Sequence, residues 1–107
     1  MTTQTDDRMQ LHTDLTTWSV HVTGELDVAS APRLAEALAL VVARGGRVVL
    51  VDLSEATFVD SSGLRVLAAA ANDLREVEGR LLVEGASGAV LRTLQAAGQL
   101  ERLARTA

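Results

Sequence analysis

The sequence predicts a single α/β domain in which helices pack on a mixed β-sheet, in the order ββαβαβα. Short alternating or β-branched segments recur along the chain, and amphipathic helical stretches follow the second, third and fourth of them. Glycines separate the segments from one another. A chain of 107 residues is one domain's worth and is long enough for one hydrophobic core.

The first half of the chain contains a hairpin and a helix. Apolar and polar residues alternate over residues 9–13 and 18–23, which predicts two paired strands. Gly24 is expected to end the second strand, and residues 25–27 begin a loop. Ser30 is the expected N-cap of the first helix, which a pair of glycines stops.

The second half alternates strands with helices. Residues 47–53 form a continuous β-branched run, which predicts a central strand buried on both faces, and residues 54–57 are expected to be a loop. The second helix starts near Ser61 and has an apolar stripe. A buried strand over residues 80–84 leads to a third helix capped by Ser87.

The two ends of the chain are less regular. Residues 1–8 are expected to form a flexible N-terminus ahead of a domain that spans residues 9–107. The tail LERLARTA is expected to add either a turn of helix or an edge strand.

Composition excludes several classes of protein. There are no cysteines, which excludes disulfides and cysteine-based zinc sites and suits a cytoplasmic protein. The longest apolar runs are too short to cross a bilayer, and the polar N-terminus lacks a signal peptide's apolar region. A net charge of −4 with one Trp and one Phe does not fit direct binding of nucleic acid. We therefore expect neither a membrane nor a nucleic acid as a partner.

The segment FVDSSGL at residues 58–64 is the main candidate for a functional site. Asp60, Ser61 and Ser62 are good N-cap residues for the helix that follows. Gly63 is a weak helix former, and a glycine in a first turn lets another backbone come close. The motif by itself leaves two interpretations open, a helix cap alone or a functional site.

Catalysis and metal binding are the weaker interpretations. The hydrolase elbow G-x-S-x-G would need a glycine where Val59 stands, and a catalytic triad would need a histidine held by an acid. The only histidines, His12 and His21, belong to the first hairpin, and a four-residue turn is not expected to place them opposite each other. Both are interpreted as solvated strand residues, so we expect no catalytic residue, metal or cofactor.

A phosphate acceptor is the third interpretation. The N-terminus of a helix has a partial positive charge and free N–H donors, so a phosphate on Ser61 would be tolerated there. The modification would change the surface by roughly −1.5 to −2 charges and leave the domain intact.

Three segments together resemble the STAS domain, and more narrowly the bacterial anti-sigma factor antagonists. They are GELDVASAP at 24–32, VDLSEATFVDSSGL at 51–64 and RLLVEGASGAVLRTLQAAG at 80–98. The resemblance runs from about Val20 to Leu103. It implies a sheet with helices on one face, and it implies that the protein is a bacterial transcription regulator and not an enzyme.

The resemblance also implies partner switching. An anti-sigma factor with serine kinase activity is the expected partner, which the bare protein binds so that a sigma factor is released. Phosphorylation of Ser61 ends that binding, and a phosphatase acting on the phosphoserine restores it. The kinase supplies ATP and Mg²⁺, so this chain needs no cofactor.

The same resemblance assigns roles to the residues around the acceptor. Asp60 is the motif acid, Ser62 the neighbour and cap, and Gly63 gives room for the partner. Asp27 matches a loop acid beside the turn. Arg65 departs from the family, where a small residue is common, and we expect it to pair with a partner acid or with the phosphate, or to be simply solvated.

Other STAS proteins have different roles, and the fold does not decide between them. The alternatives are a regulatory subunit of a lipid-transport ABC complex and a subunit of a signalling scaffold. The serine at the acceptor position favours the antagonist. The chain also stops soon after Leu103, so the family's last helix is expected to be short or absent.

Overall fold

The computed structural model describes residues 8–98 and 104–105 and contains the elements that the sequence predicts, with one short strand in addition. In chain order the elements are β1 (Met9–Asp14), β2 (Ser19–Leu26), α1 (Ala31–Ala43), β3 (Val48–Val59), α2 (Ser61–Glu76), β4 (Arg80–Glu84), α3 (Gly88–Ala96) and β5 (Ala104–Arg105).

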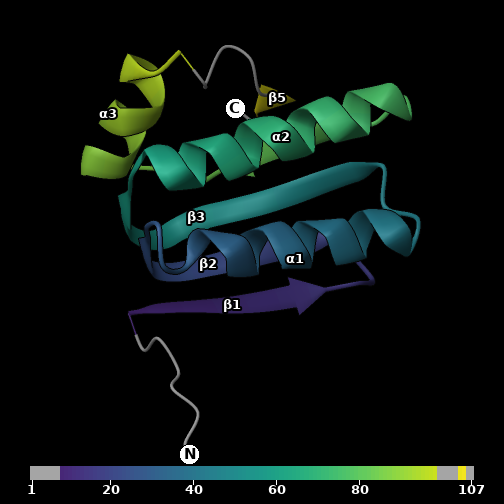
Figure 1. The fold of residues 1–107 in the computed structure, drawn as a ribbon, viewed down its shortest axis with the longest axis horizontal. Helices are drawn as coiled ribbons and strands as arrows, with labels where there is room; N and C mark the ends of the chain where they lie inside the picture. Colours follow the sequence, from purple (N-terminus) through teal and green to yellow (C-terminus); the bar gives the residue numbers. More distant parts are fainter. Residues whose placement is uncertain (1–7, 99–103, 106–107) are drawn as a thin grey trace, which may run out of the picture.

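The sheet is mixed, with the strands side by side in sequence order. β1 pairs antiparallel with β2, and each following strand is parallel to the one before it. Helices connect the parallel strands, and α1 and α2 lie next to each other over one face of the sheet (Figure 1). The predicted fold class and the order ββαβαβα are confirmed. β5 adds an edge strand from the tail, whose other residues lie outside the described ranges.

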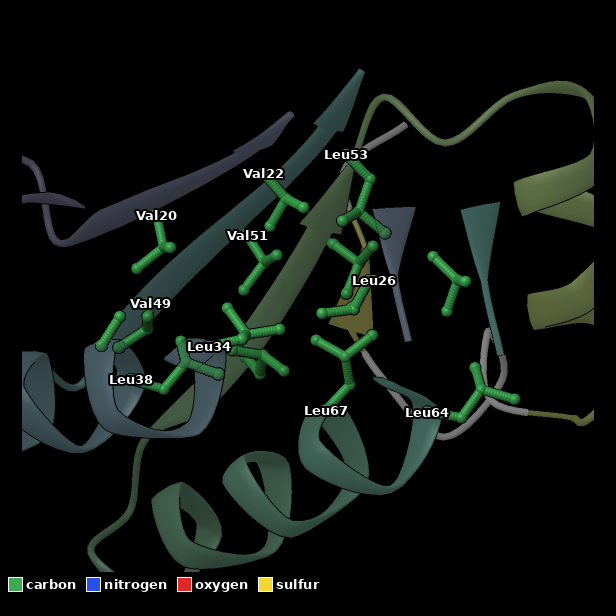
Figure 2. Packing of buried hydrophobic residues seen from close by; sticks show 14 of the residues in the cluster. Val20, Val22, Leu26, Leu34, Leu38, Val49, Val51, Leu53, Leu64 and Leu67 are labelled. Carbon is green, nitrogen blue, oxygen red and sulfur yellow. The ribbon is translucent and has the colours of Figure 1, made fainter. Parts of the chain in front are cut away.

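The core forms between the sheet and the helices. Every second residue of the central strands points toward the helices. Figure 2 shows these strand side chains together with Leu34 and Leu38 of α1 and Leu67 of α2, which belong to the same cluster. Burying one such leucine contributes about 1.5–3 kcal/mol, so this layer holds α1 and α2 on the sheet. The main contributors from strands and helices are Val20, Val22, Leu26, Val49, Val51, Leu53, Leu81, Val83, Leu34, Leu38, Leu67, Leu74, Val90 and Leu94.

β2 is longer than predicted. Gly24 does not end it, and residues 25–26 are strand where a loop was predicted. Gly24 has φ +93°, and a Cβ there would lie 2.0 Å from the carbonyl oxygen of Arg8. The Glu25 N–H donates to that same oxygen at 2.7 Å. Gly24 is thus a bulge where two backbones approach closely, and the strand continues past it to Leu26.

β3 is also longer than predicted and is buried on one face only. The predicted loop at 54–57 is strand, because β3 stays paired with β2 as far as Val59. Burial alternates along its first half, and the Val48 side chain is 47% exposed. The prediction of a strand buried on both faces is therefore wrong.

The predicted boundary between a flexible segment at residues 1–8 and a domain at residues 9–107 stays a prediction. Its first seven residues lie outside the described ranges, as do residues 99–103 and 106–107 at the other end.

Candidate functional site

The candidate site lies at the edge of the sheet where β2 and β3 end. Leu26 and Val59 are paired across the two strands, and the Asp60 N–H donates to the Leu26 carbonyl at 3.2 Å. Because the strands are parallel, the segments that follow them leave from the same edge. Asp27 and Asp60, which the sequence places far apart, therefore belong to neighbouring loops.

Asp60 is the cap of α2. Its backbone is extended, with φ −111° and ψ −169°. Its Oδ1 accepts hydrogen bonds from the N–H of Ser62 at 2.8 Å and of Gly63 at 3.3 Å. These bonds satisfy two of the N–H groups that a helix start leaves without a partner. Ser62 was expected to be the cap, and that expectation is wrong, because the Asp60 carboxylate occupies the capping position.

Ser61 is the first residue of α2 and is exposed. Its hydroxyl has no hydrogen bond to any described residue. Since Asp60 caps the helix, the Ser61 oxygen has no structural role in the first turn. It stands at the positive end of a helix of 16 residues, where an added negative group is favoured.

Gly63 is buried against β2. A Cβ at this position would lie 2.7 Å from both Cγ and Cδ2 of Leu26 and 3.2 Å from Cγ1 of Val59. Real Cβ atoms do not approach carbon so closely, and Leu26 is fully buried. The space beside Gly63 is therefore filled by Leu26 of the same chain, and the first turn of α2 rests directly on the sheet. Whether a partner also contacts Gly63 stays a prediction.

Asp27 organises the loop between β2 and α1. Its Oδ1 accepts from the N–H of Ala29 at 3.0 Å and of Ser30 at 3.1 Å, and also from the Ser30 hydroxyl at 3.1 Å. The backbone N–H of Ser30 is the largest cause that lowers the pKa of Asp27 below its ordinary value; burial opposes it, and the Ser30 hydroxyl adds to it. Asp27 is therefore charged at neutral pH and fixed in position.

Ser30 stands at the N-cap position of α1 as predicted, but its side chain does not cap the helix. Its single hydroxyl proton is shared between the Glu25 carbonyl, 2.9 Å away, and the Asp27 carboxylate, and its Oγ accepts from the Asp27 N–H at 2.9 Å. The side chain is fully buried, so it closes the loop onto the end of β2.

Arg65 lies one helical turn after Ser61 and is exposed. It makes no hydrogen bond or ion pair with the rest of the described chain. Its guanidinium is thus available to a ligand outside this chain.

Two exposed apolar residues at this edge were not singled out from the sequence. Val28, in the loop after β2, is 73% exposed, and Phe58, near the end of β3, is 46% exposed. Phe58 precedes the buried Val59, so alternation along the strand assigns it to the other face. Val28 follows an aspartate in a short loop, where no core position exists for it. The alternation along the strand at Phe58 and the loop position of Val28 are the signals in the sequence that would have identified both residues.

The histidines form a different arrangement from the predicted one. His12 and His21 are directly opposite each other in the β1–β2 pair, with ring centroids 6.0 Å apart. The prediction that the turn keeps them from facing each other is wrong, because the turn spans residues 15–18 and the register centres them. His21 Nδ1 lies 3.0 Å from Oδ2 of Asp52.

Asp52, the partner of His21, lies inside β3. Burial raises its pKa, but hydrogen bonds from the Ser54 N–H and hydroxyl and the neighbouring His21 outweigh it, so the pKa lies below the ordinary value. Over the described ranges no group of three side chains is arranged to hold a metal ion.

None of the helices that the structure describes has the length and apolar character needed to span a bilayer.

Comparisons with known proteins agree on one family. The family model described as the STAS domain matches residues 8–106. The anti-sigma-B factor antagonist of Listeria monocytogenes is 34% identical over 79 residues, which cover 74% of this chain and 69% of that protein. The anti-sigma-B factor antagonist of Staphylococcus aureus is 31% identical over 94 residues, which cover 84% of this chain and 87% of that protein.

A solved structure shows the same similarity in three dimensions. An anti-sigma factor antagonist from Mycobacterium paratuberculosis matches with a TM-score of 0.75 at 28% identity, covering 91% of this chain and 82% of that one.

Proposed function

This chain belongs to the STAS domain family, among the anti-sigma factor antagonists, and from that premise we propose that it is an antagonist switched by phosphorylation of Ser61. The observation that supports the switch most directly is that the cap of α2 and the candidate phosphate acceptor are different residues. Asp60 caps the helix, and the exposed Ser61 hydroxyl has no hydrogen bond to the described residues. Ser61 is therefore free to be modified without loss of the cap.

The proposed partner is an anti-sigma factor that is also a serine kinase. It binds the bare protein, and its sigma factor is released. The partner holds ATP and Mg²⁺, and Ser61 Oγ attacks the γ-phosphorus in line. A new P–O bond forms as the bond to the ADP oxygen breaks, and the hydroxyl proton passes to a base of the partner. This chain acts as substrate and switch, in the cytoplasm, and not as an enzyme.

The phosphate then changes binding and leaves the fold intact. It adds about −1.5 to −2 charges at neutral pH, at the helix end that favours negative charge. A partner surface that fits a neutral hydroxyl next to the ionised Asp27 would meet added charge and bulk at the same place. A phosphatase restores the binding form by removing the group.

The surrounding residues have distinct proposed roles. Asp60 and Gly63 hold the turn in the presented shape, through the cap and through the contact with Leu26. Ser62, half-buried beside the acceptor, and the charged Asp27 contact the partner at its rim. Arg65 pairs with an acid of the partner, or with the phosphate once it is present.

The test compares Ser61 variants with a matched control. Ser61→Ala is expected to bind the anti-sigma factor and to accept no phosphate, and Ser61→Glu to lose binding, both measured by pull-down and by labelling with ATP and the kinase. Ser87→Ala, which removes a serine at the start of α3 that makes no side-chain cap bond, is the control and is expected to be labelled as the wild type is. Label on Ser62 or elsewhere in the Ser61→Ala protein would contradict the site assignment.

A further inference from the structure

His12, His21 and Asp52 form a row across three neighbouring strands, on the face of the sheet that α1 and α2 do not cover. His12 is directly opposite His21 in the β1–β2 pair, and His21 is directly opposite Asp52 in the β2–β3 pair. Val20 and Val22, on either side of His21, are buried in the core under the helices, so alternation along the strand points the His21 side chain to the other face. Both imidazoles are exposed, and the proposed function makes no use of them.

The two imidazole rings are close enough to share one metal ion. Their centroids are 6.0 Å apart and their planes are tilted by 52°. Metal–nitrogen bonds of about 2.0–2.1 Å hold two rings that share an ion with their centroids roughly 4.5–6.5 Å apart. Directly opposite residues of an antiparallel pair have Cβ atoms about 4.5–5.5 Å apart. Rotation about the side-chain bonds is therefore enough to aim one nitrogen of each ring at a common ion.

Asp52 determines which nitrogen of His21 is available to a metal. Its Oδ2 lies 3.0 Å from His21 Nδ1, and its Oδ1 accepts a hydrogen bond from the Ser54 N–H at 2.8 Å. Because an ionised carboxylate only accepts, Nδ1 carries the proton, and the free lone pair of the neutral ring is on Nε2. Carboxylates that hold a histidine in this way fix its tautomer and raise its basicity as a metal ligand. Both oxygens of Asp52 are occupied, so it supports the site and is not itself a ligand.

We propose that His12 and His21 bind a divalent transition metal ion on the open face of the sheet. Nε2 of His21 and one ring nitrogen of His12 are the protein ligands, and water fills the remaining positions. Imidazole nitrogen suits Zn²⁺, Cu²⁺ and Ni²⁺, whereas Mg²⁺ takes oxygen ligands. With two protein ligands the site agrees with the lack of any group of three ligating side chains in the described part of the chain. The proposal does not depend on the proposed function of Ser61.

Titration with Zn²⁺, followed by calorimetry and by NMR of the imidazole nitrogens, tests the proposal. The wild type is expected to bind one equivalent, with a shift at Nε2 of His21 while Nδ1 keeps its proton. Mg²⁺ at the same concentration is expected to shift neither ring. His12→Gln and His21→Gln each remove a ligand, which is expected to cost at least as much affinity as the loss of a supporting carboxylate, about 10–100-fold.

Two further variants separate the role of Asp52 from that of the surface around it. Asp52→Asn is expected to weaken Zn²⁺ binding by about tenfold, the lower end of the range for a supporting group, because an amide oxygen still accepts the Nδ1 proton but lacks the charge. Gln10, exposed on β1 and opposite Thr23 in the neighbouring pair, provides the matched control. Gln10→Ala is expected to bind Zn²⁺ as the wild type does.

Three outcomes would overturn the proposal. They are a wild type that shows no saturable binding of Zn²⁺, a His12→Gln or His21→Gln protein that binds it as tightly as the wild type, and a response to Mg²⁺ equal to that to Zn²⁺. Coordination through Nδ1 of His21, or an Asp52→Asn protein with unchanged affinity, would overturn the supporting role of Asp52. Because both histidines are exposed, the single variants are expected to keep the circular dichroism spectrum of the wild type.

Discussion

Helices α2 and α3 begin at the same edge of the sheet, each after a parallel strand and each in a Ser-Gly step, but their first turns are held differently. The turn DSSG has the Asp60 cap and a buried glycine packed on Leu26. In the turn GASG, Ser87 makes no side-chain cap, and Gly88 has φ +55° and open space where a Cβ would point, with no atom within 4 Å. Similar residues thus form one helix start that is capped and packed on the sheet, and one that has neither a side-chain cap nor a packed glycine.

The largest effects are expected from alanine at the two glycines, where similar losses of stability arise from different causes. Gly63→Ala forces a Cβ against the fully buried Leu26, and such overpacking costs typically about 1–3 kcal/mol, of which better helix propensity returns at most about 1. Gly88→Ala meets no atom, and its cost of about 1–2 kcal/mol comes from the left-handed backbone alone. Urea denaturation measures both free energies of unfolding.

A double-mutant cycle with Leu26→Ala separates the two causes. Shortening Leu26 opens space beside residue 63, so Gly63→Ala is expected to cost less in the Leu26→Ala background than in the wild type. The cost of Gly88→Ala is expected to be the same in both backgrounds. Equal costs of Gly63→Ala in the two backgrounds would show that the contact with Leu26 is not what requires a glycine.

Removal of the cap is the next largest effect. Asp60→Ala leaves the N–H groups of Ser62 and Gly63 without their acceptor, and loss of an N-cap costs about 0.5–2 kcal/mol. Ser87→Ala removes no capping bond and is expected to stay within about 0.5 kcal/mol of the wild type. The unfolding midpoints in urea compare the two variants. A loss at Ser87 equal to that at Asp60 would contradict the difference between the helix starts.

The sequence was sufficient for the helices and for the residue at which α2 begins, but not for the strand ends. Stripes of leucine and alanine in α2 have a clear helical period, and Asp-Ser-Ser-Gly marks where that helix begins. Gly24 and the polar residues 54–57, by contrast, have the local composition of loops. They are strand because β2 and β3 hold each other through pairing, which is a long-range effect that local composition does not contain.

The finer features of the site depend on contacts between distant segments. Nothing near Gly63 in the sequence indicates that Leu26 fills the space beside it. The choice of Asp60 over Ser62 as the cap depends on backbone angles at the end of β3, which follow from the sheet. The row of side chains across β1, β2 and β3 likewise appears only when the three strands are paired in register.

The start of α1 provides the smallest effect and extends the comparison to a third helix. Asp27 holds the loop before α1 through the N–H groups of Ala29 and Ser30, much as Asp60 holds the first turn of α2. These bonds, with that from the Ser30 N–H the largest cause, lower the pKa of Asp27 in the folded state. Because the pKa of Asp27 is lower in the folded state, its ionised carboxylate stabilises the fold. This stabilisation is fully present above the unfolded pKa of 3.8, and it is lost as the pH falls through the folded pKa.

Asp27→Asn is therefore expected to destabilise the protein slightly at neutral pH, with a difference from the wild type that shrinks in acid below the unfolded pKa. In the wild type, the amide proton shifts of Ala29 and Ser30 measured by NMR are expected to titrate together at a pH below 3.8, and this titration is expected to be absent in the variant. Amides that titrate at or above the ordinary value would show that the carboxylate does not hold the loop, and α1 would then resemble the loosely held start of α3 and not the capped start of α2.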